Sequence, residues 1–297
     1  ELFINGQRIG EQVLAPAPTD YRKTILYNTY DVTPQLQKEN AIGVILGNGR
    51  FYTMRQNYKP YKIPTFGYPK LRLNLIVEYT DGSRQTIASD ISWKLTTEGP
   101  IRSNNEYDGE EYDARKELGD WNRTGYDDTN WIPAGRVSIP SGTLRAQMMP
   151  GMKVTESLKP VSIRKQGDKH ILDIGQNMAG WLRIRIKGQA GDSIRLRFAE
   201  RLQADGEIFT KNLRDAHCTD IYVVSGREPQ DATWAPRFVY HGFRYVEISG
   251  YPNAKTEDFT AEVVDDEMAH TGTFTCSDET LNQVLRNAFW GIRSNYK

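Results

Sequence analysis

Short segments in which apolar and polar residues alternate fill most of the first 265 residues. Examples are TILYNTYDV at 24–32, KLRLNLIVEYTDGSRQTIAS at 70–89, GWLRIRIKG at 180–188 and SIRLRFAERL at 193–202. A period of two places successive side chains on opposite faces of a strand. Asn5-Gly6, Asp81-Gly82 and Asp205-Gly206 are dipeptides that favour tight reversals between strands. The pattern predicts an all-β chain built from antiparallel β-sandwich domains of a jelly-roll-like kind.

A helical pattern occurs only near the C-terminal end, in SDETLNQVLRNAFWGIRSNY at 277–296. Ser277 is predicted to be the N-cap, and apolar residues then recur at steps of three and four. They are Leu281, Val284, Leu285, Ala288, Phe289 and Ile292. An amphipathic helix has to bury its apolar face, and the sequence predicts no second helix that could cover it. We therefore expect a helical domain to follow Lys297 in the natural protein.

The length of 297 residues is about twice that of a common domain, which predicts two domains, with one large sandwich as the alternative. Pro133, Pro140 and Pro150 interrupt strand pairing in the segment that separates two strand-rich parts. We predict a first region at 1–145 and a second region at 146–270, each a β-sandwich. Residues 271–297 are predicted to form a linker strand and the first helix of a further domain.

Charge and cysteine usage restrict the possible ligands. Lys and Arg together number 38, as do Asp and Glu, so no excess of positive charge favours nucleic acid or an anionic membrane as partner. The sequence has no run of 18 apolar residues that could span a bilayer. Cys218 and Cys276 lack a metal-type spacing and are expected to be free thiols. The compartment stays open, with a periplasmic or secreted location favoured over the cytoplasm.

Acidic residues cluster in YDGEEYDAR at 107–115, which contains Asp108, Glu110, Glu111 and Asp113. Such a group could bind calcium or supply a catalytic acid and base. In a strand, however, Glu110 would face away from Glu111 and Asp113. We favour a solvated strand edge in which Asp113 pairs with Arg115 or with an arginine elsewhere in the chain, with an ion or sugar site as the alternative. No catalytic residue and no metal ligand is assigned within this chain.

Neutral sugars are the ligands that the loop residues of the first region favour. Carboxylates, amides and guanidinium groups can each bind sugar hydroxyls, and an aromatic ring can stack on an apolar sugar face. The candidate ligand-binding residues are Asp20, Tyr21, Asn48, Arg50, Tyr52 and Asn57. Packing within a small local core is the alternative for the aromatic members of this set.

The segment GQNMAGW at 175–181 is predicted to form a polar turn between two strands. Gln176 and Asn177 would satisfy backbone groups there, and Trp181 would begin the next strand. The alternative is a polar surface that contacts a further domain. His241, in YHGFRYVEI, is either a hydrogen-bonded structural histidine or part of such an interface. The candidate interface residues are thus Gln176, Asn177, Trp181 and His241.

Several long segments resemble a known enzyme family. The segment FINGQRIGEQVLAPAPTDYRKTILYNTYDV is similar to the N-terminal β-sandwich of bacterial α-L-rhamnosidases of glycoside hydrolase family 78. IGQNMAGWLRIRIKG and WAPRFVYHGFRYVEISGYP resemble the β-domain that precedes the catalytic barrel in that family. TGTFTCSDETLNQVLRNAFWGIRSNYK resembles the linker strand and first helix of the (α/α)6 barrel. The resemblance covers essentially the whole chain.

The resemblance implies that the parent protein hydrolyses terminal α-L-rhamnosides with inversion. It places the catalytic carboxylates in the barrel, at positions that have no match in this chain. The implied partners are an L-rhamnose-containing oligosaccharide or glycoside and a C-terminal catalytic domain; no cofactor is required, and calcium is an option in the first domain. Phe51 stands where the family commonly has tryptophan. The alternative function is a stand-alone carbohydrate-binding or purely architectural β-sandwich module.

Overall fold

A computed structural model describes residues 1–52, 66–269 and 271–296. Most regular structure in these residues is β-strand, and α1 (Glu279–Asn295) is the one α-helix among them. Four short 3₁₀ turns of the described chain are η1 (Thr33–Gln35), η2 (Ala114–Lys116), η3 (Lys211–Leu213) and η4 (Thr256–Asp258). The predicted all-β class is therefore confirmed.

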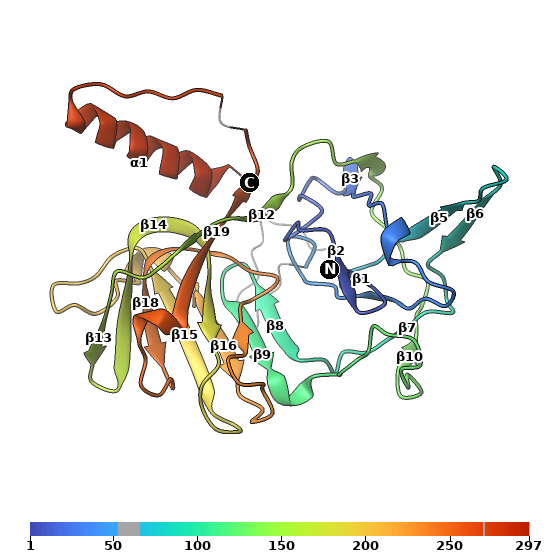
Figure 1. The fold of residues 1–297 in the computed structure, drawn as a ribbon, viewed down its shortest axis with the longest axis horizontal. Coiled ribbons are helices and arrows are strands. Elements are labelled where there is room, and N and C mark those ends of the chain that lie inside the picture. Colours follow the sequence, from blue (N-terminus) through green and yellow to red (C-terminus); the bar gives the residue numbers. More distant parts are fainter. Residues whose placement is uncertain (53–65, 270, 297) are drawn as a thin grey trace.

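The first region consists of several small sheets (Figure 1). β1 (Leu2–Ile4) lies between β2 (Gln7–Ile9) and β4 (Ile42–Val44), whereas β7 (Lys94–Leu95) pairs with β10 (Ile132–Pro133). β3 (Thr24–Tyr27) pairs in parallel with β11 (Thr143–Ala146), which differs from the expected antiparallel arrangement. This pairing brings the two ends of the first region together.

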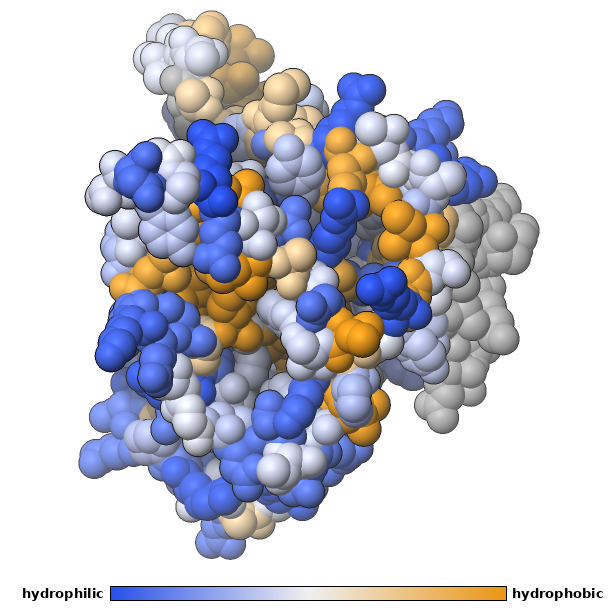
Figure 2. All heavy atoms as spheres, turned by 90° about the vertical axis from the view of Figure 1, so that its right-hand side faces the viewer, coloured by the Kyte–Doolittle hydropathy of each residue, from blue (hydrophilic) through white to orange (hydrophobic). Residues whose placement is uncertain are grey.

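β5 (Asn74–Glu78) and β6 (Arg84–Ala88) form the antiparallel hairpin that the sequence predicts. Gly82 has a φ of +84°, and the Ser83 N–H donates to Asp81 Oδ1 at 2.8 Å, so the Asp-Gly pair makes the reversal. The hairpin projects from the molecule in Figure 1. Ile76 and Ile87 are exposed on it, and Figure 2 shows further apolar side chains scattered among charged ones on this side of the molecule.

A ten-stranded sheet, here called the large sheet, contains most of the second region. Its order is β12 (Met152–Leu158), β19 (Phe259–Asp266), β14 (Lys169–Arg185), β18 (His241–Ser249), β15 (Ser193–Ala199), β16 (Thr219–Val223), β9 (Gly109–Asp113) and β8 (Ile101–Asn105). β13 (Ser162–Gln166) and β17 (Thr233–Trp234) also pair with β14. The pairing of β16 with β9 is parallel, so a hairpin from the first region completes one edge of this sheet.

The large sheet curls around the main hydrophobic core (Figure 1). Alternate residues of its central strands point inward, as a period of two requires. Fully buried examples are Leu182, Ile184, Leu196, Phe198, Phe243 and Phe259. Each such side chain contributes about 1.5–3 kcal/mol relative to an exposed one. Tyr112 and Ala114 extend this core to the β8–β9 hairpin at the edge of the sheet.

The predicted turn at 175–181 is wrong, because β14 continues from Lys169 to Arg185. Its register with β18 shifts between Asp173 and Met178, which is a bulge and not a reversal. Gly175 has a φ of +84°, a conformation that other residues adopt at a cost. A Cβ at Gly180 would collide with the Glu262 carbonyl oxygen of β19, so glycine permits the close approach of the two strands there.

Helix α1 forms over the predicted residues, but its N-cap is Asp278 and not Ser277. Asp278 Oδ1 accepts hydrogen bonds from the N–H groups of Thr280 at 2.8 Å and Leu281 at 3.3 Å. A carboxylate at this position also interacts favourably with the positive end of the helix dipole. No helix among the described residues has the length and apolar character needed to cross a membrane.

Candidate functional site

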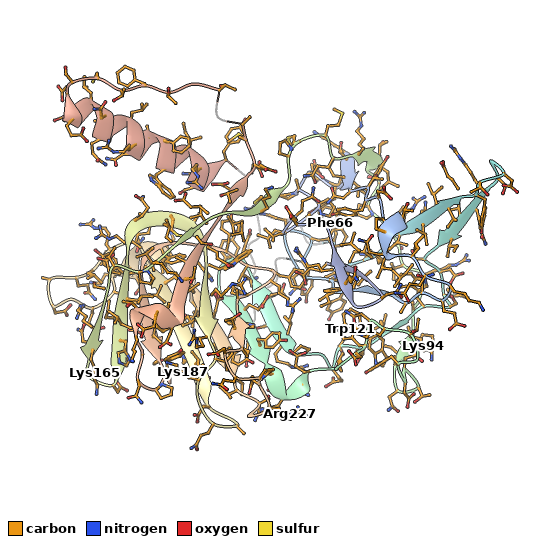
Figure 3. The ribbon with its side chains drawn as sticks, in the orientation of Figure 1. Phe66, Lys94, Trp121, Lys165, Lys187 and Arg227 are labelled. Atoms are coloured by element: carbon orange, nitrogen blue, oxygen red, sulfur yellow. The ribbon has the colours of Figure 1, made fainter. Side chains whose placement is uncertain are left out.

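The candidate sugar-binding residues of the first region take different positions. Asp20 forms a two-point ion pair with Arg22, with atom separations of 2.9 and 3.2 Å. The Tyr21 ring packs against the rings of Phe51 and Phe66 at centroid distances of 5.2 and 5.4 Å. Phe66, labelled in Figure 3, was not among the predicted candidates. Tyr21 therefore belongs to a ring cluster, whereas Asp20 is engaged by a local arginine.

Asn48 connects the first region to the β8–β9 hairpin. Its backbone N–H donates to Asn104 Oδ1 at 2.8 Å, and its Nδ2 donates to the Asn104 carbonyl oxygen at 2.9 Å. Both interactions hold the loop and leave Asn48 in a structural role. Tyr52 stacks near Tyr68 with a centroid distance of 5.0 Å. Asn57 lies outside the described residues.

Arg50 and Glu106 form an ion pair in this part of the first region. Arg50 Nε lies 3.0 Å from Glu106 Oε2, and the Arg50 side chain is 50% exposed. No described residue donates a hydrogen bond to the buried Glu106 Oε1. Burial raises the pKa values of Tyr21 and Tyr240, and the charges of Arg50 and Glu106 act on both phenols. Residues of both regions thus lie around one accessible guanidinium and one carboxylate, of which Oε1 accepts no hydrogen bond from the described residues.

Sequence reasoning missed Glu106, Phe66 and Tyr240. Glu106 follows directly on β8, in a strand pattern that gave no sign of Arg50 as its partner. Tyr240 precedes β18 and is almost 200 positions away from Arg50 in the chain. Local sequence patterns carry no information on a contact between residues so far apart. The adjacent aromatic residues of TFGYP at 65–69 were the one available signal for Phe66.

A second polar cluster is buried inside the second region around His241. His241 Nε2 lies 3.0 Å from Asp220 Oδ1, and Cys218 Sγ lies 3.3 Å from His241 Nδ1. The imidazole also stacks on Phe198 at 4.2 Å. Burial alone lowers the pKa of His241, but the Asp220 carboxylate and then Cys218 raise it to about 10. At neutral pH the ring is therefore an imidazolium enclosed by the protein and only 3% exposed.

Glu110 extends this cluster toward the first region. Its carboxylate accepts the backbone N–H groups of Arg237, at 3.1 and 3.2 Å, and of Phe238 at 3.0 Å. The Glu110 N–H donates to Asp220 Oδ1 at 2.9 Å. Burial and the neighbouring Asp220 charge raise the pKa of Glu110 to about 8, although the backbone donors act in the opposite direction. The side chain holds the 237–238 loop and is buried.

The expectation of a solvated edge for YDGEEYDAR is wrong, because β9 lies between β8 and β16 and buries Glu110 and Asp113. The predicted pairing of Asp113 with Arg115 is confirmed, at 2.8 and 2.9 Å. Glu110 and Asp113 thus bind separate partners. In the described parts of the chain, no group of three or more His, Cys, Asp or Glu residues could hold a metal ion.

The four candidate interface residues do not form one surface. Gln176 donates to the Asn177 carbonyl oxygen at 2.7 Å, and Asn177 donates to Glu200 Oε1 at 3.1 Å. Trp181 is buried, and its Nε1 donates to Glu262 Oε2 at 2.6 Å. His241 lies in the enclosed cluster described above. Cys218 and Cys276 are free, as expected.

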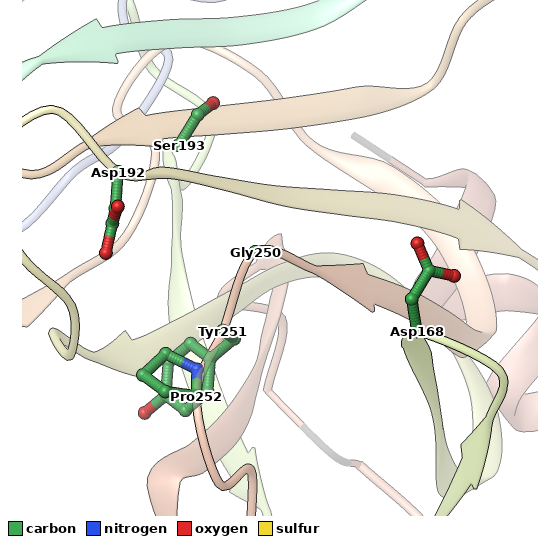
Figure 4. Close-up of a pocket in the computed structure, with 6 residues that line it drawn as sticks. All are labelled: Asp168, Asp192, Ser193, Gly250, Tyr251 and Pro252. Carbon is green, nitrogen blue, oxygen red and sulfur yellow. The ribbon is translucent and has the colours of Figure 1, made fainter.

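A shallow depression at one end of the large sheet is lined by Asp168, Asp192, Ser193, Gly250, Tyr251 and Pro252 (Figure 4). The two carboxylates stand on opposite sides of it in Figure 4 and do not point toward each other. Tyr251 donates to the Arg185 carbonyl oxygen at 2.8 Å, so its hydroxyl is already used. None of the predicted site residues lines this depression.

Comparison with known proteins decides the family. The sequence model of the family named α-L-rhamnosidase N-terminal domain matches residues 1–156, more than half of the chain. The chain belongs to the α-L-rhamnosidase N-terminal domain family. The bacterial α-L-rhamnosidase concanavalin-like domain matches residues 163–265. These matches assign a family to both strand-rich parts, while the predicted boundary between residues 145 and 146 stays a prediction.

Members of the α-L-rhamnosidase family are similar over almost the whole chain. An α-L-rhamnosidase of Streptomyces avermitilis is 38% identical, covering 100% of this chain and 29% of the relative. One of Formosa agariphila is 37% identical, covering 99% of this chain and 32% of the relative. The chain therefore spans about a third of the length of these relatives.

Solved structures of α-L-rhamnosidases have the same fold. The enzyme from Dictyoglumus thermophilum has a TM-score of 0.92 at 41% identity, covering 99% of this chain and 32% of the other. The Streptomyces avermitilis α-L-rhamnosidase complexed with L-rhamnose has a TM-score of 0.93 at 36% identity, covering 99% of this chain and 29% of the other. The architecture of both regions and α1 is thus shared with these enzymes.

Proposed function

We propose that this chain is the non-catalytic N-terminal part of a glycoside hydrolase that removes terminal α-L-rhamnose. The observation that carries the proposal is the match of 99% of this chain to 29% of an α-L-rhamnosidase complexed with L-rhamnose. The match of residues 1–156 to the N-terminal domain of α-L-rhamnosidases supports the N-terminal position. The proposed partners are an L-rhamnose-containing oligosaccharide or glycoside and a C-terminal catalytic domain. We further propose a periplasmic or secreted location, which cell fractionation would test.

The proposed reaction proceeds with inversion, which needs a general acid and a water-activating carboxylate about 6.5–9.5 Å apart. The buried carboxylates of this chain already have partners that hold them. Glu110 binds backbone N–H groups, Asp220 binds His241, and Glu262 binds Trp181 and Arg183. Their arrangement supports a structural role for these carboxylates, and we propose that the acid and base belong to the C-terminal domain.

An activity assay tests this proposal directly. Residues 1–297 are expected to give no turnover of p-nitrophenyl α-L-rhamnoside, whereas the chain extended by its C-terminal domain should hydrolyse it. Removing both the acid and the base costs many orders of magnitude in rate. Proton NMR of the first product should detect β-L-rhamnose if inversion occurs. Turnover by residues 1–297 would contradict the non-catalytic role, and an inactive extended protein would contradict the substrate.

The second candidate function is sugar binding by the first region, favoured by the exposed Arg50 side chain beside Glu106. Calorimetric titration with L-rhamnose, with and without calcium, should give a measurable binding heat that Arg50→Gln reduces at least tenfold in affinity. Arg84→Gln is the matched control, because Arg84 pairs with Glu78 on the projecting hairpin. A requirement for calcium would establish an ion site, and no heat in either buffer would leave a purely architectural module.

A further inference from the structure

Helix α1 contacts the large sheet through its C-terminal part, from Trp290 onward. Among its described side chains, Trp290, Arg293 and Ser294 near the C-terminal end are partly buried, together with Asn282 of the first turn, and none is fully buried. Asn282 bonds back to the Cys276 carbonyl oxygen just before the helix, at 2.8 Å. Trp290 packs against the main core. Figure 1 shows the chain leaving β19, running outward and returning as α1.

Arg293 makes three separate hydrogen bonds to the edge of the large sheet. Its Nε donates to Asp265 Oδ2 at 2.6 Å, one terminal nitrogen donates to Glu156 Oε2 at 2.7 Å, and the other donates to Thr155 Oγ1 at 3.0 Å. Its side chain is 14% exposed, and Asp265 is almost completely buried. A guanidinium can bind three acceptors because its donors lie in a fixed plane. The guanidinium also lies 4.6 Å from the centre of the Trp290 ring.

The rest of α1 depends on this attachment for its position. Most of the stability of a helix in a protein comes from packing of its face, and no described side chain of the 17-residue α1 is fully buried. Its other arginine, Arg286, bonds to Glu279 and Gln283 within the same helix and does not connect it to the sheet. The apolar side chains Leu281, Val284, Leu285 and Ile292 of the helix are exposed.

We propose that Arg293 is a positioning residue that holds α1 against the β12–β19 edge. Its hydrogen bonds to Asp265, Glu156 and Thr155 are here together called the latch. This contact fixes the angle at which α1 lies against the second region. It thereby presents the apolar face of α1 at a set angle to the domain that follows. This last consequence rests on the proposed function, whereas the latch itself concerns residues 1–297 alone.

Amide hydrogen exchange of residues 1–297 tests the latch. Arg293→Gln and Asp265→Asn are each expected to accelerate exchange in peptides of 279–292 by about tenfold or more, because a released helix frays. Exchange in β14 and β18 should stay unchanged. Arg293→Lys keeps the charge but loses the planar fork, so it should restore only part of the protection. Arg286→Gln is the matched control and should leave the exchange of the sheet and the last turn unchanged.

Unchanged exchange in Arg293→Gln would overturn the latch, because Trp290 alone would then hold the helix. Equal acceleration by Arg286→Gln would also overturn it, since the effect would be one of helix propensity. Faster exchange throughout β14 and β18 would show that Arg293 supports the whole sheet and not the helix direction. In the extended enzyme, Arg293→Gln should lower kcat at least fivefold with little change in KM. The exchange result stands even if that enzyme acts on another sugar.

Discussion

At the scale of single residues, His241 is a positive charge enclosed with Asp220. Its pKa is near 10 in the folded protein against 6.5 for an ordinary histidine, so the folded state holds the proton more tightly. The stabilisation is complete below pH 6.5 and is lost as the pH rises through 10. Glu110, with its pKa raised to about 8, adds a loss of stability between pH 4.5 and 8. We expect the free energy of unfolding, measured with urea, to fall steadily from pH 6 to pH 10.

Asp220→Asn should remove most of this pH dependence above pH 7 and destabilise the protein by about 3–5 kcal/mol at pH 7, because it leaves His241 without its counter-charge. His217→Asn is the control, since that imidazole is 72% exposed and lies 3.8 Å from Asp108. It should change neither value by more than about 0.5 kcal/mol. A pH slope that survives in Asp220→Asn would mean that another group carries the titration.

Residue-level prediction from sequence succeeded where partners are local. Asp113 and Arg115 are two positions apart, and their ion pair was expected. The burial of Glu110 was not, because it results from parallel pairing with β16, a strand about 110 positions later. Trp181 was predicted to begin a strand but lies inside β14, again because its contacts are with a distant part of the chain. Its partner Glu262 lies on β19, and nothing near Trp181 in the sequence indicates it.

At the scale of elements, α1 has an apolar face that the described chain leaves exposed. Leu281, Val284 and Leu285 are 53, 58 and 44% exposed. Full burial of such a side chain stabilises a protein by about 1.5–3 kcal/mol, and each of the three gains only part of this free energy. We expect residues 1–297 to self-associate at micromolar concentration and residues 1–269 to stay monomeric, as measured by size-exclusion chromatography with light scattering. Identical monomer profiles would show that the exposed face is tolerated in water. Leu281→Lys combined with Leu285→Lys should abolish the association of the longer chain.

Elements whose shape depends on local chemistry were predictable. The 74–88 hairpin follows from its Asp-Gly turn and alternating strands, and α1 follows from its period. The bulge in β14 was predicted as a turn, because glycines at 175 and 180 indicate unusual backbone in either case. Distinguishing the two requires the positions of β18 and β19, which local sequence does not contain.

At the scale of the whole molecule, the two regions share one sheet, so a cut at the predicted boundary should damage both. Residues 146–297 lack β8 and β9 and with them Tyr112 and Ala114 of the core. We expect residues 97–297 to unfold cooperatively, and residues 146–297 to melt at least about 10 °C lower or not cooperatively at all. Equal melting temperatures by calorimetry would mean that the β8–β9 hairpin adds nothing to the second region. Class and family were readable from sequence, but this shared sheet was not.

The shared sheet also has a consequence for synthesis on the ribosome. The β8–β9 hairpin is complete at Asp113, whereas its partner β16 begins at Thr219, roughly 100 residues later. At about 5–20 residues per second, the hairpin emerges some 5–20 s before its neighbour exists. Throughout that time it presents an open strand edge, which is a template for pairing with other nascent chains. Translation speed across residues 114–223 should therefore affect how much protein reaches the folded state.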